Sequence, residues 1–120
     1  MNLEINLGPP PDKVWSQNKT LHWAQRSRLR RNWREFAANV DPEDVPLPLP
    51  RSFIEVTLPF TTNQRRDPHN YTGTVVKSMI DGFVDAGFWP DDTSEYVVVL
   101  DPVCVKGEDV TIRIWPVADA

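Results

Sequence analysis

The sequence has a single cysteine, Cys104, among its 120 residues. A framework of disulfide bonds is therefore excluded, and a zinc site would have to be built without pairs of thiolates. Long apolar runs are missing as well: the longest, Tyr96–Leu100, has five residues, against about 20 for a membrane-spanning helix. The N-terminus also lacks a basic region followed by an apolar one, so we expect no classical signal peptide. We therefore expect a protein of a reducing cytoplasm with no membrane partner.

Proline, in contrast, is abundant, and the twelve prolines exclude a coiled coil or any other long uninterrupted helical architecture. With 40% hydrophobic residues and five tryptophans, the chain can bury roughly two thirds of its unfolded surface. A length of 120 residues is typical of one domain. We therefore expect residues 1–120 to form a single domain that folds alone.

The net charge of -4 is distributed very unevenly along the chain. The segment Lys19–Arg34 carries six basic residues and no acid, whereas Asp81–Asp109 carries eight acids and one lysine. The first segment is suited to a polyanion such as nucleic acid, and the second to holding cations. The alternative is a solvated helix face together with an acidic surface that only improves solubility.

Apolar spacing predicts a strand, a helix and a second strand in the first half of the chain. Asn2–Leu7 alternates between polar and apolar residues, as a half-buried strand does, and Phe53–Leu58 repeats that pattern. Between residues 21 and 40, apolar residues recur every three or four positions, which predicts a helix. The following segment, Asp41–Arg51, is rich in proline and predicts an extended connector.

The second half predicts a helix and two strands. Apolar residues from Val76 to Val84 lie on one helical face, and Gly87 closes that helix. Two later runs, Glu95–Val105 and Asp109–Trp115, flank a short polar turn and are typical of a β-hairpin. The order β-α-β-α-β-β predicts an α+β fold with a small mixed sheet.

Two polar segments carry the residues suited to chemistry. Arg65–Asn70 combines two arginines with a carboxylate, an imidazole and an amide, and Asp91 and Asp92 supply adjacent carboxylates further along. Carboxylate oxygens are the ligands of Mg²⁺ and Mn²⁺, and such sites need only one or two of them beside water and phosphate. These parts are sufficient for a phosphodiester nuclease, in which Lys77 or the arginines would stabilise the transition state.

Each of these residues also has a purely structural interpretation. Asp67 followed by Pro68 is typical of a helix N-cap, and Asp91–Asp92 fits a turn. Lys77 fits an ion pair with Asp81 four residues later on a helix. Two interpretations, stacking on unpaired bases and packing in the core, remain for three aromatic residues: Trp15, Trp23 and Trp33.

Taken together, Arg65–Asn70, the Lys77–Asp81 spacing, the segment Asp85–Asp92 and the late Lys106–Gly107 resemble the RusA family of Holliday junction resolvases. The resemblance covers roughly the second half of the chain well and the first half weakly. It implies a small homodimeric, Mg²⁺-dependent endonuclease that nicks four-way or otherwise branched DNA in recombination and repair. The family is common in phages and prophages, so the expected location is the cytoplasm of a bacterial cell.

The family's essential residues, three aspartates and a lysine, are transferred to this sequence by position. The expected catalytic residues are Asp67, Lys77 and Asp92. The expected ligands of Mg²⁺, or of Mn²⁺, are Asp67, His69, Asp91 and Asp92. The expected DNA-binding residues are Arg30, Arg31, Arg65, Arg66, Lys77 and Lys106.

The sequence departs from the family pattern in two places. His69 stands where the family often has a second aspartate, which removes a negative charge and favours a metal that accepts nitrogen, such as Mn²⁺. About four residues are added between Asn70 and Lys77. If the helix ran from Pro68 to Ala86 it would be about 28 Å long, with Asp67 and Asp92 near opposite ends.

Two arrangements would bring these aspartates together. Either the helix begins late, around Thr74, or a two-fold dimer pairs Asp67 of one subunit with Asp91 and Asp92 of the other. Two other functions stay open beside the nuclease. One is a junction-binding protein of the same fold that does not cleave. The other is a binding or assembly module without DNA that uses the proline-rich connector and the acidic surface.

Overall fold

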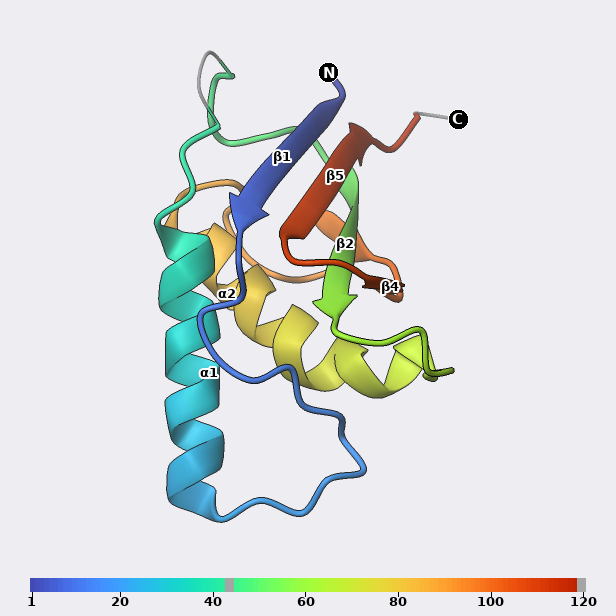
Figure 1. The fold of residues 1–120 in the computed structure, drawn as a ribbon. Coiled ribbons are helices and arrows are strands. Elements are labelled where there is room, and N and C mark those ends of the chain that lie inside the picture. The colour runs from blue at the N-terminus through green and yellow to red at the C-terminus, as the bar shows by residue number, and fades with distance from the viewer. Residues whose placement is uncertain (43–44, 119–120) are drawn as a thin grey trace.

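The computed structural model describes residues 1–42 and 45–118, which form one α+β domain. A five-stranded mixed sheet carries both α-helices on one of its faces (Figure 1). The expected fold class is therefore confirmed. The elements are β1 (Leu3–Gly8), α1 (Trp23–Ala38), β2 (Ser52–Phe60), α2 (Lys77–Asp85), β3 (Val97–Val99), β4 (Val103–Lys106) and β5 (Val110–Pro116).

Strand β2 is the centre of the sheet, whose order is β1-β5-β2-β3, with β4 also paired to β2. Strand β5 is antiparallel to both β1 and β2, whereas β3 and β4 are parallel to β2. The hairpin expected from Glu95–Val105 and Asp109–Trp115 is therefore wrong, because β2 lies between β4 and β5. Alternating residues predict strands but do not specify their partners. The connection crosses the end of β2, where the Gly107 N–H donates to the Phe60 carbonyl at 3.0 Å.

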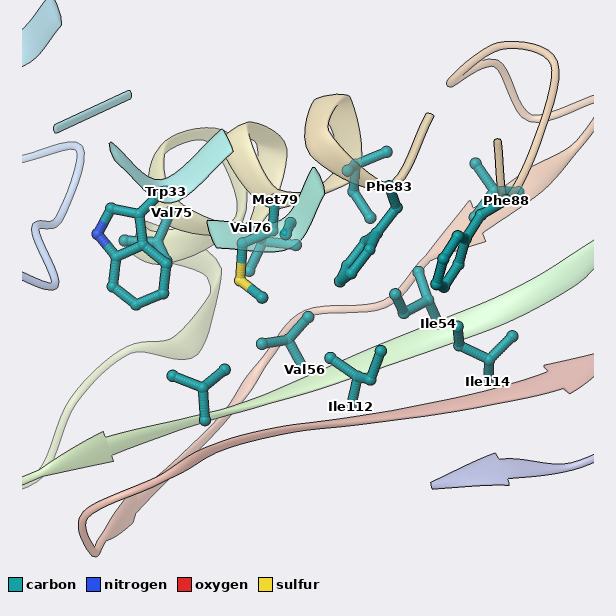
Figure 2. Packing of buried hydrophobic residues seen from close by; sticks show 14 of the residues in the cluster. Trp33, Ile54, Val56, Val75, Val76, Met79, Phe83, Phe88, Ile112 and Ile114 are labelled. Atoms are coloured by element: carbon teal, nitrogen blue, oxygen red, sulfur yellow. The ribbon is translucent and has the colours of Figure 1, made fainter. Parts of the chain in front are cut away.

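The hydrophobic core lies between the sheet and the two helices (Figure 2). The period of two in β2 directs Ile54 and Val56 toward the helices, and β5 adds Ile112 and Ile114. From the helical side, α1 contributes Trp33, whose indole N–H donates to the Lys13 carbonyl at 2.9 Å. Helix α2 contributes the buried side chains of Met79, Ile80 and Phe83 to the same layer.

The two helices approach each other closely at Gly82. A Cβ atom at this position would lie 2.2 Å from the Arg34 carbonyl oxygen and 2.7 Å from the Ala37 Cβ. Only glycine therefore allows α1 and α2 their present separation, which sets the width of the groove described below.

Helical turns precede α2 without interruption. A 3-10 turn, η1 (Pro68–Tyr71), leads into a π turn, η2 (Thr72–Val76), which leads into α2. Of the two arrangements left open, the late helix start is met only in part: the regular α-helix begins at Lys77, but the residues added after Asn70 are wound into the π turn and do not loop back along the helix. Such turns accommodate extra residues within a helix and are frequent at functional sites.

The end of α2 is a Schellman motif that redirects the chain. Gly87 has a φ of +87°, its N–H donates to the Val84 carbonyl, and the Phe88 N–H donates to the Phe83 carbonyl at 3.0 Å. Phe88 also stacks on Phe83, with 5.1 Å between the ring centroids. Because Phe88 and Trp89 are buried, the chain folds back over α2 instead of leaving it.

In the part of the chain that the structure describes, no helix is both long and apolar enough to cross a membrane.

Candidate functional site

Lys77, the first residue of α2, is the centre of a small charged cluster. Its Nζ donates to Oδ1 of Asp81 at 2.8 Å and also to Oδ2 of Asp92. The bond to Asp81 confirms the pairing expected from a spacing of four residues. The contact with Asp92 results from the backward turn at Gly87, which returns the chain to the beginning of α2.

The charges in this cluster hold one another in their ionised forms. Burial lowers the pKa of Lys77, but its hydrogen bonds and charge interactions with Asp81 and Asp92 outweigh that effect and raise the pKa. The hydrogen bond from Lys77 lowers the pKa of Asp92, against a smaller opposing effect of burial. Because the cluster is partly exposed, solvent screens these interactions, and their contribution to folding is small.

Asp91 is adjacent to this cluster and stabilises the turn that carries Asp92. Its Oδ1 accepts a hydrogen bond from the Asp92 N–H at 2.8 Å, as expected for a turn. Asp91 nevertheless remains exposed to solvent. Asp91 and Asp92 line a hollow together with Asp81 and Arg34, so three carboxylates border one open space.

A groove of about 470 Å³ lies between α1 and α2 beside this hollow. Arg30, Arg31 and Arg34 line one wall, and Lys77 and Asp81 line the other. The structure thus brings together three of the expected site residues from two distant segments, Arg30, Arg31 and Lys77. A row of guanidinium groups along an open groove is suited to phosphate groups.

Arg34 and Asp85 are functional candidates that the sequence analysis missed. They form a bidentate ion pair across the helix contact, with Arg34 Nε 2.6 Å and Nη2 2.9 Å from the two Asp85 oxygens. The hydrogen bond from Arg34 lowers the pKa of Asp85, and the same bond raises the pKa of Arg34. Helical spacing was the available signal: Arg34 follows Arg30 by four residues, and Asp85 follows Asp81 by four.

Asp67 lies at the other end of the helical segment and acts as its N-cap. Its Oδ1 accepts a hydrogen bond from the His69 N–H at 3.2 Å, with Pro68 in the first helical turn. The His69 Nδ1 is 3.2 Å from Oδ1 of Asp101, which also accepts a bond from the Thr72 hydroxyl at 2.7 Å. The hydrogen bond from Thr72 lowers the pKa of Asp101, and the hydrogen bond with His69 lowers it further by a smaller amount. No sequence pattern connected Asp101 with His69, because 32 residues separate them.

The remaining expected DNA-binding residues lie around the end of β2 and are not among the residues that line the groove. Arg66 places its guanidinium 3.9 Å from the Phe60 ring centroid and donates to the Gln64 carbonyl at 2.7 Å. Lys106 is the register partner of Phe60 where β4 pairs with β2. Arg65 is exposed in the loop that also carries Arg66. The structure thus divides the expected DNA-binding residues into a groove set and a loop set.

The expected metal ligands are divided in the same way. Asp91 and Asp92 lie at the Lys77 cluster, whereas Asp67 and His69 lie one helical segment away, roughly 15 Å along its axis. Among the residues that the structure describes, no three histidine, cysteine or acidic side chains gather in a way that would hold a metal ion. A single chain therefore does not assemble the expected set of four ligands.

The carboxylates at the Lys77 cluster nevertheless fit a hard divalent cation. Mg²⁺ keeps several water ligands and is commonly bound by one or two carboxylates together with phosphate oxygens, which Asp91 and Asp92 can complement. Chemically, the cluster combines ligand oxygens, one ammonium group and a wall of arginines.

No protein-family model and no curated protein matches this chain.

Proposed function

We propose that the protein is a metal-dependent, structure-specific DNA endonuclease that resolves Holliday junctions or other branched DNA. The observation that carries this proposal is the position of Lys77, held between Asp81 and Asp92 at the edge of an arginine-lined groove. Ionised carboxylates, an ammonium group and guanidinium groups in one open groove are the components of phosphodiester hydrolysis. The resemblance to the RusA family implies the same chemistry.

The chain's own residues would bind and orient the DNA. Arg30 and Arg31 are exposed, and they would bind backbone phosphates on the α1 wall. Lys77 keeps its charge at neutral pH, because its pKa is raised, and it would stabilise the negative charge that develops on the attacked phosphate.

Asp91 and Asp92 are the residues that would hold Mg²⁺ or Mn²⁺. Asp92 is ionised at neutral pH, and the hydrogen bond from Lys77 lowers its pKa further. When bound, the ion would polarise the scissile phosphate and lower the pKa of a water molecule. Asp67 and His69 would join this site only from a second copy of the chain, which is the reason to propose a homodimer with two-fold symmetry.

A second candidate function follows from the division of the expected ligands into two pairs. A chain that binds the junction in its groove but holds no metal would be a junction-binding protein without nuclease activity. In that protein Lys77 would stay paired with Asp92, and the arginines alone would supply the affinity.

Cleavage of a synthetic four-way junction in Mg²⁺ or Mn²⁺ tests the proposal. The wild type should nick the junction symmetrically, and Asp92→Asn should reduce cleavage at least about 100-fold, since even outer-shell partners of a metal contribute about 10- to 100-fold. Junction binding should persist or strengthen, because the substitution removes a charge that repels phosphate. Glu108→Gln, which removes an exposed carboxylate in the turn after β4, is the matched control and should behave as the wild type.

Three outcomes are decisive. A wild type that does not bind the junction would refute the proposal, and one that binds without cleaving in either metal would establish the second candidate function. Full activity of Asp92→Asn would remove this residue from the site and leave only its role as the partner of Lys77.

A further inference from the structure

Trp23 is the exception among the tryptophans of this chain. Trp15, Trp33 and Trp89 are buried, and Trp115 lies half-buried on the sheet. Trp23, in contrast, is 68% exposed, and the closest aromatic ring is that of His22, 5.6 Å away. Large apolar side chains with this exposure contribute little to the core, so the indole is available for a ligand.

The position of Trp23 connects it to the arginine-lined groove. It is the first residue of α1, and Arg30 follows seven residues later, about 20° away around the helix axis and about 10 Å along it. Arg30 lines the groove, and Arg26 lies between the two residues on an exposed part of the helix. About 10 Å corresponds to roughly three base steps along one DNA strand.

The charges around Trp23 select a polyanion as its ligand. The first turn of α1 contains no acid, so the positive end of the helix dipole is not compensated by a carboxylate. Among the described residues, neither Arg26 nor Arg30 forms an ion pair, in contrast to Arg28 with Asp12 and Arg34 with Asp85. A lipid surface would require a whole apolar helix face, but that face of α1 is buried in the core.

We propose that Trp23 stacks on an unpaired base at the branch point of DNA whose phosphates are bound by Arg26 and Arg30. This inference rests on the proposed function, because it assumes that the groove binds DNA. An indole stacks on any base whose face is free, whereas the bases of an intact duplex already stack on one another. Trp23 would therefore add preference for branched or single-stranded DNA, and the arginines would add affinity for every form.

Binding measurements on three DNA forms test the proposal: a four-way junction with one unpaired base at the branch, a single strand and a blunt duplex of equal length. Trp23→Ala should weaken binding of the first two forms about fivefold or more and change duplex binding less than about twofold. Trp23→Phe should retain part of the preference. Arg30→Ala is the comparison: it should weaken all three forms similarly and reduce the salt dependence by about one ion per lost contact.

A fluorescent adenine analogue at the unpaired position gives a second readout. Its emission should be quenched by the wild type and not by Trp23→Ala, because quenching requires a stacked ring. If Trp23→Ala binds all DNA forms as the wild type does, or weakens all of them equally, the inference is overturned while the proposed function stands. If the wild type binds no DNA, both are overturned. Because Trp23 is exposed, the urea midpoint of each variant should match that of the wild type.

Discussion

Replacing Gly82 by alanine should separate the two helices that form the groove. The new Cβ would meet the Arg34 carbonyl oxygen at 2.2 Å and the Ala38 backbone nitrogen at 2.9 Å, where ordinary contacts begin at about 3.4 Å. Because two of the three closest atoms belong to the backbone of α1, no side-chain rotation relieves the contact. The helices must move apart by about 1 Å or unfold locally.

Two opposing effects determine the magnitude. Overpacking of a buried contact costs about 3 kcal/mol at the upper end of its usual range. Alanine in place of glycine within a helix stabilises it by about 1 kcal/mol. The net loss of about 2 kcal/mol should lower the urea midpoint by about 1 M, for a slope near 2 kcal/mol per molar.

Gly73→Ala is the matched control, because no atom beyond its chain neighbours and its own helical turn lies within 4 Å of the position that its Cβ would occupy. It lies in the π turn of the same helical segment and lines the same groove. Its urea midpoint should be equal to that of the wild type or higher. A Gly82→Ala variant as stable as Gly73→Ala would refute the close approach of α1 and α2.

Two further predictions concern the charged residues. Asp67→Asn and Asp92→Asn should each be inactive alone. If a dimer joins these aspartates in one site, mixing the two variant proteins should restore cleavage. If cleavage is not restored, the site belongs to single chains. The lowered pKa of Asp92 means that its ion pair stabilises the fold above the ordinary value of 3.8 and is lost as the pH falls through the lower folded value. Lys77→Met should move the Asp92 pKa, followed by carboxyl NMR, upward toward 3.8, and an unchanged pKa would show that no such pair exists.

The fold was predictable where local patterns determine it. Helix α1 follows from the spacing of Leu29, Trp33 and Ala37, which are all fully buried. The end of α2 follows from Gly87, which takes a backbone conformation that other residues rarely adopt. The neighbours of β2 were not predictable in this way, because a period of two shows that a segment is extended and not where it pairs.

The same distinction applies to the candidate site. The Lys77–Asp81 pair follows from the geometry of one helix, and the capping role of Asp67 follows from the adjacent proline. The contact between Lys77 and Asp92 depends on Phe88, which is buried against Phe83 and so reverses the chain. Tertiary packing of this kind leaves no periodic signal in a single sequence.

Packing of α1 on α2 also changes the meaning of the uneven charge distribution. The basic segment Lys19–Arg34 and the acidic segment Asp81–Asp109 are far apart in the chain, yet Arg34 and Asp85 join them. The net charge of -4 therefore describes neither wall of the groove. On the α1 wall, Arg30 and Arg31 can meet phosphates directly. On the other side, Lys77 compensates only part of the negative charge of Asp81 and of Asp91 and Asp92 in the adjoining hollow. These carboxylates would repel phosphates unless a divalent cation lay between them, and this is the physical reason why a nuclease at this site would depend on a divalent metal.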